Sequence, residues 1–220
     1  MNSDTTPLVI VGGGELAAGV LEAARSRPET WHVMGYFAPK ESKLSQAPFG
    51  VKWLGDDDKA GEWKDKAWFV LGVGDVGISQ RRQQLVAAMS GDGVRWATVI
   101  HKAAWVSPSA ELEPGVVVLA GAVVNAQAKI GRQTLIQSQA VVEHDVVLGC
   151  FTQLAPAVAI GGGSKIGAGS FLGLGCRIRD HVELGPSSLV AMGAVVTRSG
   201  SGRAIWIGVP AKPQSNDEEE

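Results

Sequence analysis

The sequence predicts an α/β domain followed by a solenoid of short parallel strands. Two observations lead to this fold class. Residues 1–102 alternate between strand-like and helix-like apolar patterns, whereas residues 103–213 follow a six-residue repeat without helical periodicity. A fixed short repeat is typical of a solenoid, because each unit can bury its apolar face only against its neighbours. Residues 214–220 are polar and are expected to form a frayed tail.

The first domain is expected to contain four strands and two helices. Strand, crossover and strand in this order indicate a small parallel sheet covered by helices, as in the nucleotide-binding half of a Rossmann-like domain. Residues 38–66 are weakly patterned, and the acidic run 56–58 is expected to cap a turn. The predicted strands are Leu8–Val11, Val33–Phe37, Trp68–Val73 and Arg95–Val99, and the predicted helices are Leu16–Arg25 and Ser79–Met89.

From residue 105 to residue 200 the chain divides into sixteen six-residue blocks whose second residue is always Val, Leu or Ile. About a quarter of the chain is made of these residues, so chance agreement is on the order of 10⁻⁹. Each block predicts one short strand and one corner, with the second side chain pointing inward. The inward residues are Val106, Leu112, Val118, Val124, Ile130, Ile136, Val142, Leu148, Leu154, Ile160, Ile166, Leu172, Ile178, Leu184, Val190 and Val196.

A longer period is superimposed on the repeat. Glycine occupies the third place of a block at 131, 149, 167 and 185, which are 18 residues apart. Three blocks therefore form one coil with three faces. The sixth place is mostly small or Val, as a crowded corner requires, and no block is interrupted, so we expect no external loop to project from the prism.

The composition limits the possible partners and location. The 220 residues include 45% hydrophobic side chains, and 20 basic against 22 acidic residues leave a formal charge of −2. This balance indicates neither nucleic acid nor an anionic membrane as a partner. The sequence shows no signal peptide and no 18-residue apolar run, so we expect a soluble, cytoplasmic protein. Cys150 and Cys176 form no metal-ligand pattern with the four histidines and are expected to be buried thiols.

Three strings carry a resemblance to a known family: residues 100–110, Val142-Glu143-His144-Asp145, and Gly208-Val209-Pro210-Ala211-Lys212. Together with the domain order they resemble the hexapeptide-repeat sugar acyltransferases. These include the bacillosamine-type and perosamine-type nucleotide-sugar N-acetyltransferases and the sialic acid O-acetyltransferases. The resemblance spans the whole chain. It implies a left-handed parallel β-helix and a homotrimer with active sites between subunits. It also implies acetyl-CoA as co-substrate, no metal, and a nucleotide-linked 4-amino-4,6-dideoxy sugar of GDP-perosamine or UDP-bacillosamine type as acceptor.

His144 is the candidate general base. It occupies the fourth place of its block, at a corner, so its ring is expected to reach the surface of the prism. Imidazole titrates near cytoplasmic pH and can take the proton that the attacking amine loses. Asp145 is the candidate residue that raises its basicity, since a carboxylate beside imidazole favours the imidazolium. His181 is expected to be only a corner residue and His101 a structural one at the domain junction.

The resemblance also places residues around the two substrates. The family's coenzyme-contacting positions fall on Gln153, Gly162, Leu174 and Met192, with Gln153 standing where the bacillosamine enzyme has histidine. Lys212 is a candidate partner of a coenzyme phosphate. In the first domain the family's G-x-x-G-H turn reads Gly12-Gly13-Gly14-Glu15-Leu16, and an acidic pair after the second strand is replaced by Ala38-Pro39. The remaining candidates for binding the nucleotide or sugar are Gly12, Gly13, Gly14, Gly74, Asp75, Arg81 and Gln137.

Three other functions are compatible with parts of the sequence. Residues 12–17 satisfy G-x-G-x-x-[GA] after a strand, which is typical of NAD-binding proteins, but no acidic residue near Phe37 would bind the ribose. A non-catalytic trimeric scaffold fits the altered turn of the first domain, but the intact His144-Asp145 pair opposes it. O-acetylation of a sialic acid or a related sugar remains an alternative, because the same base can activate a hydroxyl.

Overall fold

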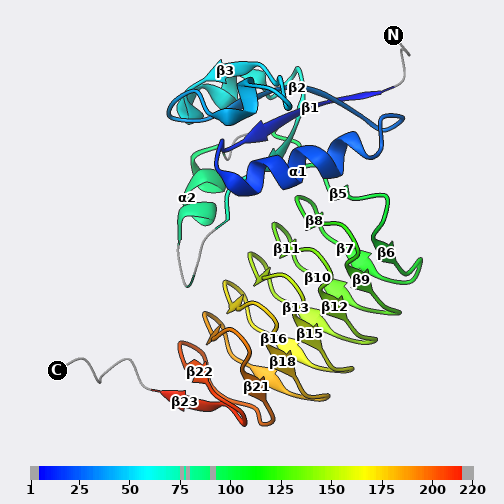
Figure 1. Ribbon diagram of the computed structural model, residues 1–220, viewed down its shortest axis with the longest axis vertical. Coiled ribbons are helices and arrows are strands. Elements are labelled where there is room, and N and C mark those ends of the chain that lie inside the picture. Colours follow the sequence, from blue (N-terminus) through cyan, green and yellow to red (C-terminus); the bar gives the residue numbers. More distant parts are fainter. Residues whose placement is uncertain (1–4, 75–76, 78–79, 90–92, 215–220) are drawn as a thin grey trace, which may run out of the picture. The chain divides into compact units, whose positions relative to one another are not determined.

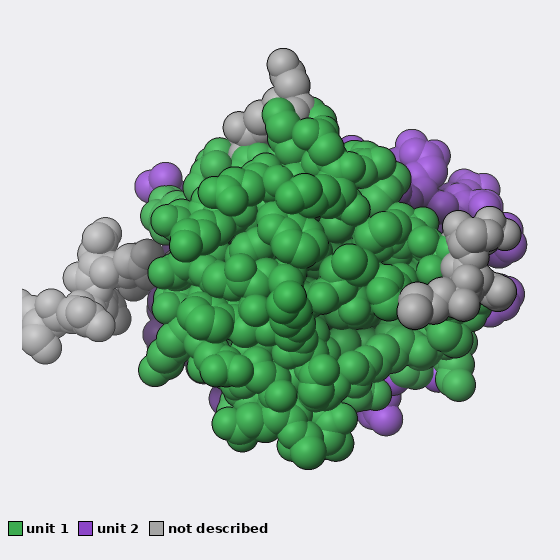
Figure 2. Space-filling model, turned by 90° about the horizontal axis from the view of Figure 1, so that it is seen from above, with its two compact units in different colours: residues 1–75, 80–102 green, residues 76–79, 103–220 purple. Residues whose placement is uncertain are grey.

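The computed structural model describes residues 5–74, 77, 80–89 and 93–214 (Figure 1). The chain forms two compact units, one of residues 1–75 and 80–102 and one of residues 76–79 and 103–220, which Figure 2 distinguishes by colour. No helix among the described residues is long and apolar enough to cross a membrane.

The first unit is built on a parallel sheet with the strand order β3-β2-β1-β4. Residues 8–11 of the central strand are fully buried, as expected for a parallel strand whose two faces are both covered. Helix α1 buries small and aliphatic side chains, among them Ala17 and Leu21. The strands are β1 (Thr6–Val11), β2 (Trp31–Phe37), β3 (Trp53–Gly55) and β4 (Trp68–Leu71), and the helices are α1 (Glu15–Arg25), α2 (Arg81–Ala88), and the 3-10 turns η1 (Lys43–Ser45) and η2 (Asp57–Trp63).

The prediction of one continuous fourth strand at 95–99 was only partly correct. That segment pairs with β4 through a single bridge between Phe69 and Trp96, supported by hydrogen bonds from Phe69 N to Arg95 O (2.9 Å) and from Ala97 N to Phe69 O (2.8 Å). The last predicted residue, Val99, begins a separate short strand, β5 (Val99–Ile100). The fourth strand is β3, whose three residues lie in the weakly patterned segment and are too few to show a period.

The second unit is a triangular prism of stacked coils (Figure 1). The strands β9 to β18 each pair in parallel with the strands 18 residues before and after them, which confirms three blocks per coil. Face 1 contains β6 (Trp105–Val106), β9 (Val123–Val124), β12 (Val141–Val142), β15 (Ala159–Ile160), β18 (Arg177–Ile178) and β21 (Val195–Val196). Face 2 contains β7 (Glu111–Leu112), β10 (Lys129–Ile130), β13 (Val147–Leu148), β16 (Lys165–Ile166) and β19 (Glu183–Leu184). Face 3 contains β8 (Val117–Val118), β11 (Leu135–Ile136), β14 (Gln153–Leu154), β17 (Phe171–Leu172), β20 (Leu189–Val190), β22 (Ile205–Ile207) and the antiparallel β23 (Lys212–Gln214).

The inward column is confirmed. From Val118 to Val196 every second-place residue is at most 4% exposed, and only the first two, Val106 and Leu112, are partly open. From Ala122 to Ala194 the small sixth-place residues are buried, and hydroxyls among them are satisfied locally. Thr152 Oγ1 donates to Gly149 O, and Ser170 Oγ donates to Gly167 O, each at 2.7 Å. These hydrogen bonds explain how polar residues are tolerated inside a crowded corner.

Every corner from Gly115 to Gly193 has the same backbone conformation. The fifth residue of each block adopts a left-handed φ, between 55° and 82°, whether or not it is glycine. Eight of these fourteen residues are not glycine, including Asp145 and His181. A left-handed φ is uncommon outside glycine. This conformation determines where the corner side chains lie.

Candidate active site

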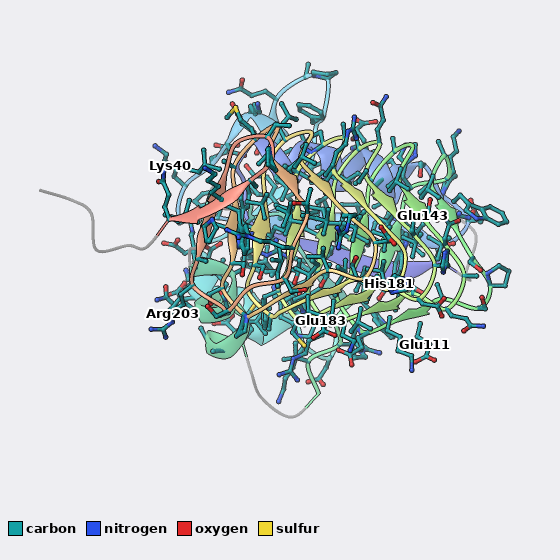
Figure 3. The ribbon with its side chains drawn as sticks, turned by 90° about the horizontal axis from the view of Figure 1, so that it is seen from below. Lys40, Glu111, Glu143, His181, Glu183 and Arg203 are labelled. Carbon is teal, nitrogen blue, oxygen red and sulfur yellow. The ribbon has the colours of Figure 1, made fainter. Side chains whose placement is uncertain are left out.

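The corner between faces 1 and 2 carries the candidate base, and we call it the histidine edge. Its fourth and fifth places hold Ala126-Gln127, His144-Asp145, Gly162-Gly163 and Asp180-His181 on successive coils. Backbone hydrogen bonds fix their register: Gly163 N donates to His144 O, and His181 N donates to Gly162 O, each at 2.9 Å. Figure 3, which looks along the prism from below, shows Glu143 and His181 on this same side of it.

His144 and Asp145 form an exposed pair on the histidine edge. His144 Nδ1 lies 2.8 Å from Asp145 Oδ2, and the two side chains are 62% and 54% exposed. The expected surface position of the ring is thus confirmed. The left-handed φ of 60° at Asp145 allows the adjacent carboxylate to reach the ring. A carboxylate can only accept, so Nδ1 is the donor and the lone pair of the neutral ring is on Nε2.

Gly162 leaves that second nitrogen uncovered. A Cβ placed on Gly162 would lie 2.6 Å from His144 Nε2 and 2.7 Å from Cε1, which is closer than side-chain atoms approach one another. The imidazole therefore rests over the bare α-carbon of the next coil. The backbone N–H of Gly162 has no acceptor among the described residues. The arrangement thus combines a free base nitrogen with a nearby backbone donor.

Glu143 supports the same edge from the third place of its block. Its Oε2 accepts a hydrogen bond of 3.0 Å from Asn125 Nδ2, one coil earlier. This contact directs the Glu143 carboxylate toward Asn125, and the ring of His144 keeps Asp145 as its carboxylate partner. The acidic neighbours on the two sides of the histidine therefore have different tasks.

The expected coenzyme contacts are not all brought together with His144. Leu174 and Met192 stack on successive coils at the corner between faces 3 and 1, where they are 53% and 76% exposed. Gly162 lies on the histidine edge instead. Gln153 lies in β14 and is only 4% exposed, so it offers little surface to a ligand. Lys212 is exposed in β23, and Gln137 is half-buried at the Leu174 corner.

In the first unit, the three glycines of the turn after β1 differ in their surroundings. Gly12 has a φ of 112°, and a Cβ there would overlap the side chain of Val73. A Cβ on Gly13 would lie 3.0 Å from both Ala38 Cβ and Ser42 Oγ. Gly14 alone faces open space, at the amino end of α1. The structure therefore gives Gly12 and Gly13 packing roles and leaves Gly14 accessible.

The turn after β4 is held by a residue that the sequence analysis missed. Arg82 is 1% exposed, and its Nη1 donates to the carbonyl of Val73. The predicted residue Arg81 is exposed at the start of α2, Gly74 is exposed in the turn, and Asp75 lies outside the described residues. An arginine beside another arginine gives no sequence signal that tells which one is buried, because only the helix orientation decides it.

The acidic run 56–58 does not cap η2 through a side chain, because Asp56 makes no capping hydrogen bond. Burial raises the pKa of Asp57, as do the charges of Asp56 and Asp58, while Arg81 lowers it. Asp57 Oδ1 is buried without a hydrogen-bond partner among the described residues. These aspartates follow β3, so they lie at the same carboxyl edge of the sheet as Gly14.

The cysteines behave differently from each other. Cys176 is buried, as expected, and burial raises the pKa of its thiol to about 12. Cys150 is only partly buried, with its Sγ 3.8 Å from Glu113 Oε2, so the expectation was wrong for this residue. Cys150 occupies the fourth place of its block, on the surface of a corner, whereas Cys176 occupies the buried sixth place. Within the described part of the chain, no three His, Cys, Asp or Glu residues are grouped to hold a metal ion.

A prism of hexapeptide coils with an exposed His-Asp pair on one edge defines the class of hexapeptide-repeat acyltransferases. Comparison with protein-family models and with curated proteins finds no match. Among solved structures, perosamine N-acetyltransferase from Caulobacter crescentus, in complex with CoA and GDP-perosamine, is 34% identical with a TM-score of 0.84. The alignment covers 95% of this chain and 97% of that one.

Two further structures agree over the whole chain. The acetyltransferase domain of PglB from Neisseria gonorrhoeae, in complex with acetyl coenzyme A, is 25% identical with a TM-score of 0.85, covering 96% of this chain and 100% of that one. WeeI from Acinetobacter baumannii shares the fold at 20% identity, with a TM-score of 0.77 and coverage of 95% and 100%. The chain belongs to the hexapeptide-repeat sugar acyltransferase family and is an acyltransferase. Its predicted fold, a Rossmann-like domain followed by a left-handed parallel β-helix, is confirmed.

Proposed function

We propose that this protein transfers the acetyl group of acetyl-CoA to the amine of a GDP-linked 4-amino-4,6-dideoxy sugar. The observation that carries the proposal is the exposed pair of His144 and Asp145, with His144 Nε2 open over Gly162. The 34% identity to an enzyme solved with CoA and GDP-perosamine supports both substrates. Two structures of that enzyme with one histidine replaced, by alanine and by asparagine, also hold CoA and GDP-perosamine.

In this mechanism His144 acts as general base. The sugar amine attacks the thioester carbonyl directly, and Nε2 takes the proton that the nitrogen loses as the tetrahedral intermediate forms or collapses. Asp145 holds the ring through Nδ1 and stabilises the imidazolium that results. Coenzyme A leaves as the thiol. No serine or cysteine among the described residues hydrogen-bonds to His144, which favours direct transfer over a covalent acyl-enzyme.

The oxyanion of the intermediate is assigned to the backbone N–H of Gly162. This donor lies on the residue beneath the ring of His144 and is not used by another acceptor among the described residues. A backbone donor held in place by coil-to-coil hydrogen bonds needs no reorganisation when charge develops on the carbonyl oxygen. Removing one such donor typically costs about 10²–10³ in turnover.

The first unit is assigned to the nucleotide-linked sugar. Gly14, open at the amino end of α1, suits a phosphate, since a helix amino terminus presents unpaired N–H groups and a partial positive charge. Gly74 and Arg81 lie at the next turn of the same sheet edge, where Arg81 adds a positive charge. Asp75 remains a predicted contact, and Gln137 on the prism remains a predicted contact of the sugar.

The active form in this proposal is a homotrimer with the sites between subunits. Face 2 is charged, with Lys165 Nζ 2.7 Å from Glu183 Oε1 and Lys129 Nζ 3.9 Å from Glu111 Oε1, which suits solvent. Face 1 is mostly apolar in its first column, and its Trp105 is 58% exposed. Face 1 lies between the histidine edge and the Leu174 corner. A neighbour packed on face 1 can bring its own Leu174 and Met192 to the histidine edge, a contact that closes after three copies.

The assay that tests the function supplies acetyl-CoA with GDP-4-amino, UDP-4-amino or free sialic acid acceptors and follows thiol release. We expect release with the GDP-linked amine. Activity on the UDP-linked amine alone would move the substrate to the bacillosamine type, and activity on sialic acid alone would replace N-acetylation by O-acetylation.

Light scattering should give three times the chain mass of 22.9 kDa. A cytoplasmic location is part of the proposal, because acetyl-CoA is supplied there.

A further inference from the structure

His181 lies much closer to the candidate site than a plain corner residue would. A Cβ on Gly163 would lie 2.6 Å from His181 Nδ1 and 2.8 Å from Cε1, so the ring folds over Gly163. His144 folds over Gly162 in the same way from the other side. Two imidazoles therefore flank one bare Gly162–Gly163 step on the histidine edge, and the backbone hydrogen bonds described above hold all three coils in register.

The ring of His181 has no evident structural task. The residue is exposed, and no hydrogen bond or ion pair of its ring occurs among the described residues. Its backbone has a left-handed φ of 55°, which asparagine or glycine would adopt at lower cost. Apart from its contact with Gly163, a histidine here thus contributes neither a polar interaction nor a favourable backbone conformation. Its free ring nitrogens are available to a ligand that crosses the glycine step.

The spacing fits the arm of the acetyl donor. Neighbouring coils are about 4.8 Å apart, so the coils of His144 and His181 are separated by about 9.5 Å. In an extended chain with bonds of about 1.5 Å, the two amides of the coenzyme arm lie roughly 4–9 Å from its sulphur. With the thioester beside His144, an arm running toward the carboxyl-terminal coils places an amide within reach of His181.

The charges along the edge favour the same direction. Glu143 and Asp145 lie on the amino-terminal side of the glycine step, where the phosphates of a coenzyme would be repelled. On the other side Arg179 is exposed, with Nε 4.0 Å from Asp180 Oδ1, and Arg198 is exposed one coil further. Guanidinium groups bind phosphate oxygens well, so these arginines suit the end of the coenzyme that carries the phosphates.

We propose that the coenzyme arm lies across the Gly162–Gly163 step and that His181 binds it through a hydrogen bond to one of its amides. This inference rests on the proposed use of acetyl-CoA. It adds His181 as a residue that positions the donor thioester for attack, beside the base that removes the proton.

The test compares the binding of CoA and of 3′,5′-ADP, which lacks the arm, by titration calorimetry on the full chain. The variants are His181→Asn and His181→Gly, both compatible with a left-handed φ, so failure of one to fold leaves the other. Ser187→Asn is the matched control, because Ser187 has the same φ of 55° at the next corner. We expect CoA binding to weaken about threefold to tenfold in both His181 variants, with 3′,5′-ADP binding unchanged.

Three results would overturn the proposal. CoA affinity within twofold of the unmodified protein in both variants would remove His181 from the donor site. An equal loss for CoA and 3′,5′-ADP would show that His181 does not act on the arm, and a raised KM for the sugar alone would place it at the acceptor. If the unmodified protein binds no CoA, the proposed function fails first, and this inference fails with it.

Discussion

The prism and the α/β unit of this protein are organised by different rules. In the prism, the strands β9 to β18 each pair with strands 18 residues away on both sides, so one local rule is repeated along the chain. In the α/β unit the separations are irregular: Val9 pairs with Gly35 on one side and Phe69 on the other. A repeated sequence pattern therefore determines which strands pair in the solenoid. In the irregular sheet, strand pairing depends on tertiary contacts that no local sequence pattern reveals.

The candidate site residues also differ in how far the sequence pattern determines their positions. The base, its carboxylate and the glycine beneath them follow from the coil geometry, since residues 18 apart are stacked. The substrate candidates of the α/β unit depend on turns whose packing differs from one glycine to the next. Four predictions test this division.

The largest loss of folding stability is expected from a substitution at the carboxyl end of the prism, where the repeat stops. Trp206 pairs with Val190 and takes the inward place of the last coil, 1% exposed. Trp206→Ala should destabilise the protein by about 3–5 kcal/mol, because it opens a large cavity. Trp206→Phe should cost far less, since the indole Nε1 has no hydrogen-bond partner among the described residues. Thermal unfolding measures the loss of stability in both variants. Equal losses would mean that the indole N–H of Trp206 makes a hydrogen bond in solution.

His144→Asn should lower kcat by roughly 10²-fold or more, the typical scale for a general base. Trimer mass and CoA affinity should stay unchanged, because the ring is exposed and supports no packing. Steady-state kinetics with calorimetry separates the two effects. Near-normal turnover in this variant would remove His144 from the mechanism.

Gly162→Ala should lower kcat by about tenfold or more without unfolding the prism, because the new Cβ would displace the His144 ring from its place. Ala126 and Ala168 occupy the same place in other blocks, so the backbone accepts a Cβ there. Ala168→Gly is the matched control at another corner. Unchanged kcat in Gly162→Ala would show that the ring can work from a different position.

The smallest effect concerns the α/β unit and pH. Since burial raises the pKa of Asp57 in the folded state, folding favours its protonated form, and its contribution to stability decreases as pH rises above the ordinary value of 3.8. Asp57→Asn should therefore raise the melting temperature at pH 7, and the gain should shrink as pH falls below that value. Melting curves at several pH values check the sign, with Asp65→Asn, whose side chain is exposed, as control.

Much of the prism could be predicted because aliphatic residues recur at a fixed six-residue spacing. The inward column, the strand in every block and the surface position of His144 were all readable from spacing. The strand β3 was not, because three residues carry no period. Arg95–Val99 has a strand-like composition, yet it pairs with β4 through a single bridge and only Val99 lies in a strand. Arg82 was missed because burial of one of two adjacent arginines depends on how α2 packs.

By itself, the sequence determined the coil, its six-residue rungs and the identity of the His144-Asp145 pair, since these depend on residues adjacent in the chain or separated by whole repeats. Only the tertiary structure decided which nitrogen of His144 is open and that His181 folds back over the next glycine. The physical reason is that a repeat specifies which residues stack, whereas the direction of each side chain follows from the left-handed corner backbone and from the neighbours it meets there.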